Sequence, residues 1–289
     1  MTAPNVGLWQ IYFKPEQFGL LDPLFTPLDN SSHNDEALEF AVFQRLQVSG
    51  QTQAFGRWGA LSWKFTQKTG MTGQRLLEAV HQAPDVDVFY MNPYPYNEAL
   101  HVSPWWQGEV AHPDFLRVAE AFLAAAGLDS RICHRLTPGS DFSVCNYFVG
   151  SARFWERYLD FVERALAMAE QHMPEHLRQK LHTADADWQG IHHQATYVPF
   201  LVERLFGVFL HSDTGKSLKA RQLPCPIGEA GLNEDLTHLR EAKRVALMTK
   251  SARVLQDWQR LRKLYFEHRY GAVWCQRYLE RVMSAEVLF

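Results

Sequence analysis

Short apolar segments alternate with amphipathic ones over the first 150 residues of the chain. Strand-like apolar runs occur at residues 6–13, 59–65 and 86–91. Helices are predicted between them at residues 36–48, after the capping pair Asn34-Asp35, and at 73–81. Residues 21–34 hold several turn signals and predict a loop. Strands that alternate with helices are typical of an α/β fold with a Rossmann-like, mainly parallel sheet.

The pattern is less regular after Met91. Residues 94–113 predict a long loop, and long loops in compact domains are often functional. Further elements are predicted as a helix at 114–126 ended by Gly127, a strand at 143–149, a helix capped by Ser151 and a helix at 195–210. Residues 236–282 are helix-rich. We expect an α/β domain at residues 1–222 and a helical C-terminal extension at 223–289.

Composition narrows the class of protein. The chain has 289 residues and a formal net charge of -3, which argues against a protein that wraps nucleic acid. No apolar run approaches the roughly 18 residues that span a bilayer, and the N-terminus lacks the basic and apolar regions of a signal peptide. The cysteines are dispersed without a CxxC pair, as is typical of reduced thiols. These features predict a cytoplasmic protein.

Two lysines border the strand predicted at residues 59–65. A lysine is almost never fully buried without a partner, so Lys64 and Lys68 indicate a polar cleft that receives anions. Ligands bind such sheets at the carboxyl ends of the strands, where Lys64 and Asn92 are expected. Three tryptophans are suited to stack on a sugar or a base, although burial in the core explains most aromatic side chains: Trp63, Trp105 and Trp106.

Paired carboxylates open the strand predicted at residues 86–91. Asp85 and Asp87, one residue apart, could hold Mg²⁺ or Mn²⁺ against a diphosphate, because both ions prefer oxygen ligands. A solvated start of a strand explains the pair equally well. Asp185 and Asp187 form a second candidate pair of the same kind.

Glu203 and Arg204 belong to a predicted helix that is apolar nearly all round. A carboxylate held in such a helix needs a partner and is expected to have a perturbed pKa. The alternative is that both side chains face solvent. Cys145, with scattered histidines, allows a thiol nucleophile, although single buried cysteines are usually inert.

The C-terminal helices carry many basic residues against few acids. A solvated helix face is the usual explanation, and contact with an anionic membrane surface is the alternative. The residues concerned are Arg240, Lys243, Arg244, Lys250, Arg253, Arg260, Arg262, Lys263 and Arg269.

Three stretches together resemble a bacterial family of cell-surface polysaccharide glycosyltransferases. They are Leu61-Ser62-Trp63-Lys64-Phe65 with Lys68-Thr69-Gly70, Cys145-Asn146-Tyr147-Phe148-Val149 with Phe154-Trp155, and Tyr197-Val198-Pro199-Phe200 with Glu203-Arg204-Leu205-Phe206. The last is similar to the "ERL" helix of transferases of capsule and lipopolysaccharide synthesis. The resemblance covers roughly residues 5–211. It implies a GT-A-like, single-Rossmann architecture and a nucleotide-sugar donor, with Asp85 and Asp87 as candidates for metal and diphosphate; a metal-independent enzyme stays open.

We therefore expect a glycosyltransferase that moves a sugar from a nucleotide-sugar donor to a glycan acceptor in surface polysaccharide assembly. Lys64, Lys68 or a carboxylate-held cation would stabilise the departing nucleoside diphosphate. Asp187 or Glu203 is the expected base for the acceptor hydroxyl. Substrate contacts are further assigned to Asn92, Asn146 and Arg204, beside the tryptophans. The alternatives are a non-catalytic glycan-binding or assembly protein of the same fold and, third, a hydrolase using Cys145.

Overall fold

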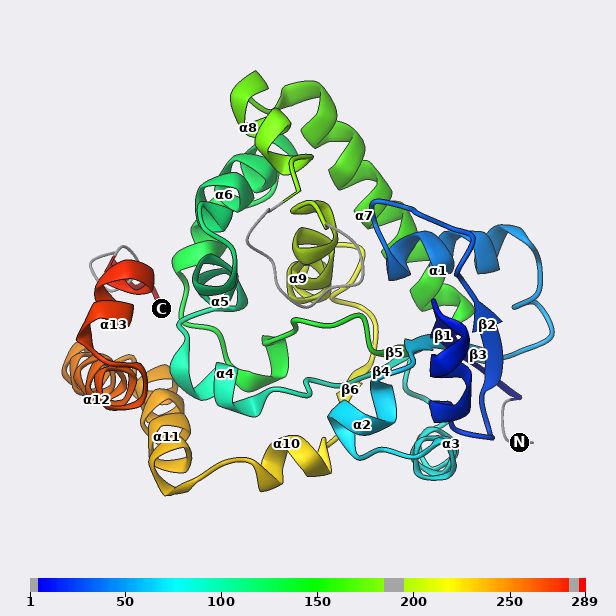
Figure 1. Ribbon diagram of the computed structural model, residues 1–289, viewed down its shortest axis with the longest axis horizontal. Helices are drawn as coiled ribbons and strands as arrows, with labels where there is room; N and C mark the ends of the chain where they lie inside the picture. Colours follow the sequence, from blue (N-terminus) through cyan, green and yellow to red (C-terminus); the bar gives the residue numbers. More distant parts are fainter. Residues whose placement is uncertain (1–4, 185–194, 281–285) are drawn as a thin grey trace.

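The computed structural model describes residues 5–184, 195–280 and 286–289 (Figure 1). Its strands form one six-stranded sheet in the order β2-β1-β3-β5-β4-β6. The pairs β1–β2, β1–β3 and β4–β6 are parallel, and β5 runs antiparallel to β3 and β4. The predicted mainly parallel α/β sheet is confirmed. The strands are β1 (Val6–Tyr12), β2 (Thr26–Asp29), β3 (Arg57–Ser62), β4 (Val88–Tyr90), β5 (Phe148–Ser151) and β6 (Ala220–Gln222).

Helices flank this sheet and continue beyond it. Figure 1 shows α1, α7 and α9 on one side of the sheet and α2, α3 and α10 on the other. The helices of the first 211 residues are α1 (Glu39–Val48), α2 (Phe65–Thr69), α3 (Gly73–His81), α4 (Pro95–Leu100), α5 (Pro104–Ala111), α6 (Phe115–Ala125), α7 (Ala152–His172), α8 (Glu175–Leu181) and α9 (Val198–His211). Those that follow β6 are α10 (Pro226–Ala230), α11 (Glu234–Thr249), α12 (Ala252–Tyr270) and α13 (Ala272–Tyr278).

The two faces of the sheet fill two separate apolar cores. Successive side chains of a strand point to opposite faces, so Trp58 and Ala60 of β3 join the core under α1, α7 and α9. Leu61 points the other way, into the core shared with α3. Trp58 also stacks on Trp155 of α7, with ring centroids 4.0 Å apart, and its carbonyl accepts a hydrogen bond from the Trp155 indole.

A third apolar core joins the C-terminal helices to the rest of the chain. Trp258 of α12 is buried in this core, and its indole donates to the carbonyl of Ala99 in α4. Lys243 and Arg262, predicted for an exposed basic face, are buried here, and Arg262 donates to the carbonyl of Leu100. The nine basic residues therefore do not form one solvated surface.

Several predicted elements have different limits in the structure. The loop predicted at residues 94–113 is wrong, because α4 and α5 occupy most of it and each begins with a proline in its first turn. The loop predicted at 21–34 contains β2. The strand expected at 143–149 begins only at Phe148. The helix predicted at 114–126 is confirmed as α6, with Gly127 at a φ of 71° after its end.

No helix in the described part of the chain combines the length and the apolar character that crossing a bilayer requires.

Candidate active site

Three segments meet at the edge of the sheet where the parallel strands end. β3 ends at Ser62, directly before Lys64, and β4 ends at Tyr90, before Asn92. β5 is antiparallel to both, so the segment that precedes it lies at the same edge. A buried hydrogen bond of 3.1 Å joins the hydroxyls of Ser62 and Tyr147, which ties β3 to that segment. The predicted position of Lys64 and Asn92 is confirmed.

Lys68 stands among polar side chains from each of these segments. Its ammonium group lies 5.5 Å from the centre of the Tyr94 ring. Burial alone would lower the pKa of Lys68, but the neighbouring Tyr147, Cys145 and Tyr94 raise it above its ordinary value. The side chain therefore carries a positive charge at neutral pH.

Two carboxyl groups share the surroundings of Lys68. Burial raises the pKa of Glu203 to about 8. The positive charge of Arg204 lowers this pKa, and the nearby carboxyl group of Glu39 raises it further. The pKa of Glu39 is also raised by burial, and Lys68 works to lower both values. The perturbed pKa that the sequence predicted for Glu203 is confirmed. A carboxyl group of this kind exchanges a proton near neutral pH, as an acid or a base requires.

The carboxyl group of Glu203 is partly exposed and makes no close ion pair. Its side chain is 21% exposed, and its nearest ion-pair contact is 3.8 Å from its Oε2 to the Nη1 of Arg204. That distance is too long for a direct hydrogen bond. Glu203, Glu39 and Lys68, together with Tyr94 and Asn146, are called the edge cluster below.

Asn146 brings unused hydrogen-bonding groups to the same edge. The residue is only 4% exposed, yet neither its amide nitrogen nor its amide oxygen has a partner among the described residues. The amide nitrogen of Asn92 is in the same state. An unsatisfied buried polar group costs about 1–3 kcal/mol, so such groups call for a ligand or ordered water. Their position at the carboxyl edge favours a ligand.

Trp63 and Lys64 form the approach to this edge. Both are half-buried, and the Lys64 ammonium lies 4.8 Å from the centre of the Trp63 ring. A cation over an aromatic face presents positive charge and a flat apolar surface together. The prediction that Trp63 stacks on a ligand stays compatible with this arrangement.

Asp85 and Asp87 do not share a site with the lysines, and this predicted grouping is wrong. Val88 of β4 and Arg57 of β3 lie near each other across β5, which places both aspartates at the amino edge of the sheet. Asp85 pairs with the ammonium of Lys219 at 2.9 Å. The carboxylate of Asp87 accepts from the Lys219 backbone at 2.9 Å and from the Ser151 hydroxyl at 3.3 Å. Because the oxygens of both carboxylates already have partners at the amino edge, they do not fit a metal site that would hold a diphosphate at the carboxyl edge.

Trp105 and Trp106 are structural, contrary to the prediction that they stack on a ligand. They are 1% and 0% exposed, so neither ring has a free face. Arg204, predicted to bind substrate, is also buried: it donates to the carbonyls of Pro104 at 2.8 Å and Phe200 at 2.7 Å, and to the side chain of Gln107. The guanidinium joins α5 to α9, and its charge lowers the pKa values of Glu203 and Cys145 without a direct contact to a ligand.

Cys145 is a poor nucleophile in this structure. Burial, followed by the nearby charge of Glu203, raises the pKa of its thiol, which therefore stays protonated at neutral pH. Asp185 and Asp187, the second carboxylate pair, lie outside the described residues. Within residues 5–184, 195–280 and 286–289, no group of three or more histidine, cysteine, aspartate or glutamate side chains is placed to hold a metal ion.

Glu39 and Tyr94 are site residues that the sequence analysis missed. Glu39 stands four residues before Phe43, which is buried in the first core, so it occupies the apolar stripe of its own helix. A carboxylate on the apolar stripe of a helix is a sequence signal for a buried, and therefore candidate functional, acidic residue. Tyr94 has no such signal, because it falls in the segment for which the sequence predicts a loop.

No protein-family model matches this sequence, and no curated protein or solved structure matches it either.

Proposed function

We propose that the chain is a glycosyltransferase that moves a sugar from a nucleotide-sugar donor to a glycan acceptor in surface polysaccharide assembly. The observation that carries this proposal is the edge cluster, in which a charged lysine, two carboxyl groups with raised pKa values and a buried amide without a partner among the described residues lie at the carboxyl edge of a Rossmann-like sheet. That edge is where sheets of this class bind their ligands.

The two lysines are proposed to bind and stabilise the departing nucleoside diphosphate. Lys68 is charged and partly desolvated, and Lys64 stands at the approach, so both would meet negative charge that builds up on the leaving group. Trp63 would cover the flat face of the base or sugar. Asn146 would donate to and accept from hydroxyl groups of the donor.

Glu203 is assigned as the base. With a pKa of about 8 it is mostly protonated at pH 7, and its ionised fraction, which grows as the pH approaches 8, accepts the proton of the acceptor hydroxyl. Glu39 is a positioning residue, because its proximity contributes to the high pKa of Glu203.

In this proposal lysines neutralise the negative charge of the donor's diphosphate. A metal held by Asp85 and Asp87 does not, because the oxygens of both carboxylates already have partners at the amino edge of the sheet. Activity is therefore expected to persist in EDTA. Loss of activity on chelation, with recovery in Mn²⁺ or Mg²⁺, would show that other carboxylates hold a metal.

A donor screen tests the proposal directly. UDP-, GDP-, CMP- and dTDP-sugars are added singly, and the unfolding temperature is measured, because a ligand that binds only the native state raises it. At least one donor is expected to stabilise the protein, and Lys68→Met is expected to remove that stabilisation. Lys216→Met, which changes a lysine paired with Asp213 on the exposed surface, serves as the matched control.

A donor that stabilises the protein is next tested for transfer or hydrolysis with Glu203→Gln. Retained binding with lost turnover supports Glu203 as the base. If no donor stabilises the protein, the alternative of a non-catalytic glycan-binding or assembly protein of the same fold takes its place. A cytoplasmic location at the inner membrane and contact of the C-terminal helices with anionic lipid stay predictions.

A further inference from the structure

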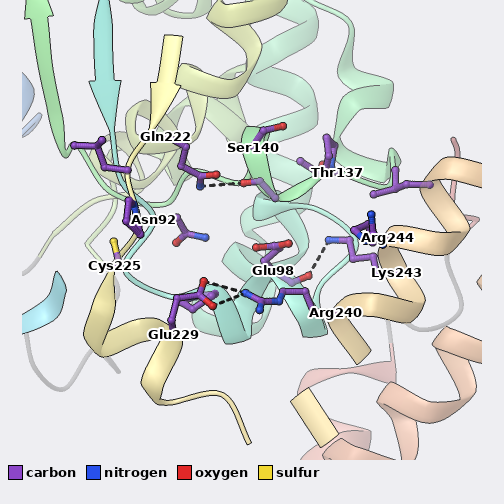
Figure 2. A pocket seen from close by; sticks show the side chains of 16 residues that line it. Asn92, Glu98, Thr137, Ser140, Gln222, Cys225, Glu229, Arg240, Lys243 and Arg244 are labelled. Carbon is purple, nitrogen blue, oxygen red and sulfur yellow. Dashed lines mark hydrogen bonds and ion pairs between the residues drawn. The ribbon is translucent and has the colours of Figure 1, made fainter. Parts of the chain in front are cut away.

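A polar pocket lies where β4 and β6 end, next to the segment that carries Asn92. It has a volume of about 540 Å³ and is bounded by α4, α10 and α11 (Figure 2). Ligand pockets commonly measure about 300–1,000 Å³, so this one is large enough for a small molecule. Asn92 follows β4 on one wall, and Figure 2 shows Glu98 between Glu229 of α10 and Lys243 of α11.

Most charged groups of the pocket are held by partners. The Nη1 of Arg240 lies 2.9 Å from each carboxylate oxygen of Glu229. Arg244 pairs with Glu241 on its own helix. Lys243 is 2% exposed, and its ammonium donates to the backbone carbonyls of Glu98 at 2.9 Å and His101 at 2.7 Å. These contacts fix the side chains and leave little net charge to attract an ion.

Glu98 is the exception. Its side chain is half-buried, and it accepts no hydrogen bond from any residue in the part of the chain that the structure describes. It packs against Gly139, where an added Cβ would lie 2.4 Å from the Oε1 of Glu98. Burial raises the pKa of this carboxyl group, while Lys243 and Arg240 work to lower it. A carboxylate with two unused oxygens, facing a pocket, requires hydrogen-bond donors from outside the protein.

The geometry points to a neutral saccharide as the ligand of this pocket, bound through two neighbouring hydroxyls that donate to the carboxylate of Glu98. The N–H groups of Arg240 that Glu229 does not engage would donate to further sugar oxygens. Pro95, Pro138 and Leu247 add apolar surface for the C–H face of the ring.

An anionic ligand fits less well. A phosphate in the pocket would face the carboxylates of Glu98 and Glu229, and the guanidinium and ammonium groups that could receive it already have partners. A sugar hydroxyl both donates and accepts, so it suits a wall on which fixed donors and acceptors alternate.

This inference goes beyond the proposed function and does not depend on it. The segment from Asn92 to Tyr94 contributes to both the pocket and the edge cluster, since Asn92 lines the pocket and Tyr94 contacts Lys68. A saccharide held in the pocket would therefore stand next to the site proposed for the donor. Binding itself requires no transfer.

Saturation-transfer difference NMR tests the inference on the full chain. Glucose, galactose, mannose, rhamnose and N-acetylglucosamine are titrated one at a time, with sodium phosphate as a competitor. At least one sugar is expected to bind and to resist phosphate. Glu98→Gln and Arg240→Gln are each expected to weaken its binding about tenfold, or about 1.4 kcal/mol. Asp257→Asn, a change on the exposed face of α12 outside the pocket, is the control.

Thermal unfolding of each variant separates a lost ligand from a lost fold. Lys68→Met is expected to leave saccharide binding unchanged while it removes the response to nucleotide sugars, which distinguishes failure of this inference from failure of the proposed function. The inference is overturned if none of the five sugars binds, if phosphate displaces the sugar, or if Glu98→Gln and Arg240→Gln both bind as the unaltered protein does.

Discussion

Replacing Glu203 by glutamine should stabilise the protein, and the gain should depend on pH. Burial holds the pKa of this carboxyl group at about 8, against an ordinary value of 4.5. Between these two values the folded chain binds a proton that the unfolded chain releases. The free energy of unfolding therefore falls as the pH rises from about 4.5 towards 8, because the buried carboxyl group must either keep its proton or ionise without solvent. Glutamine resembles the neutral carboxyl group and carries no such penalty.

The size of the effect follows from the same two values. Each pKa unit corresponds to about 1.4 kcal/mol, so the full difference approaches roughly 5 kcal/mol above pH 8. At pH 7, where the folded group is still mostly protonated, the expected gain from Glu203→Gln is on the order of 3 kcal/mol. At pH 4 both proteins should have the same stability, because the carboxyl group is largely protonated in both states.

Urea unfolding at several pH values between 4 and 8 measures this difference. The free energy of unfolding should fall more steeply with pH in the unaltered protein than in Glu203→Gln. Glu156→Gln, on the exposed face of α7, should leave the slope as it is. Equal slopes for the unaltered protein and Glu203→Gln, or a Glu203→Gln variant that is less stable at every pH, would refute the argument that this carboxyl group is desolvated.

Three further changes separate structural residues from the site. Arg204→Met should lower the free energy of unfolding by about 2–4 kcal/mol, because it leaves buried carbonyls without a donor; urea unfolding measures this, and a fully stable variant contradicts it. Trp105→Phe should cost about 1–3 kcal/mol while nucleotide-sugar binding is retained, as a melting series with and without donor would show. Asp87→Asn should weaken the contact with Lys219 yet leave donor turnover within about twofold, and abolished turnover in a folded variant would restore it to the site.

Much of the sheet was predictable because its signals are local. Apolar runs gave β1, β3 and β4, and caps placed α6 and α7 with little error. Ser151 shows why: its hydroxyl accepts from the Phe154 backbone nitrogen, an interaction that spans three residues. The position of Lys64 also followed from sequence, since a parallel strand fixes which edge its last residues reach.

The errors come from contacts between distant parts of the chain. Trp106 was assigned to a ligand, but α12 covers it with residues more than 150 positions later in the sequence, among them Arg262, whose guanidinium lies 5.3 Å from the centre of its ring. The sequence groups Asp85 and Asp87 with the lysines because it predicts them on neighbouring strands. Strands that run in the same direction all begin at one edge of the sheet and end at the other. Asp85 and Asp87 come before β4 and therefore lie at the edge where strands begin, whereas Lys64 follows β3 and lies at the opposite edge.

The edge cluster contains polar groups with fewer partners than Arg204 and Lys243 have. Arg204 is buried and has three acceptors for its guanidinium, and the ammonium of the buried Lys243 donates to two carbonyls. Glu203 and Asn146 have no comparable partners. Substitution of either residue by a neutral or apolar one would remove a free-energy cost of about a few kcal/mol that the unpaired polar group imposes on folding. Groups that a fold leaves unsatisfied where it could satisfy them are expected where a ligand supplies the missing contacts. This contrast places the proposed site residues among the destabilising ones, so a stabilising substitution such as Glu203→Gln is expected to cost turnover.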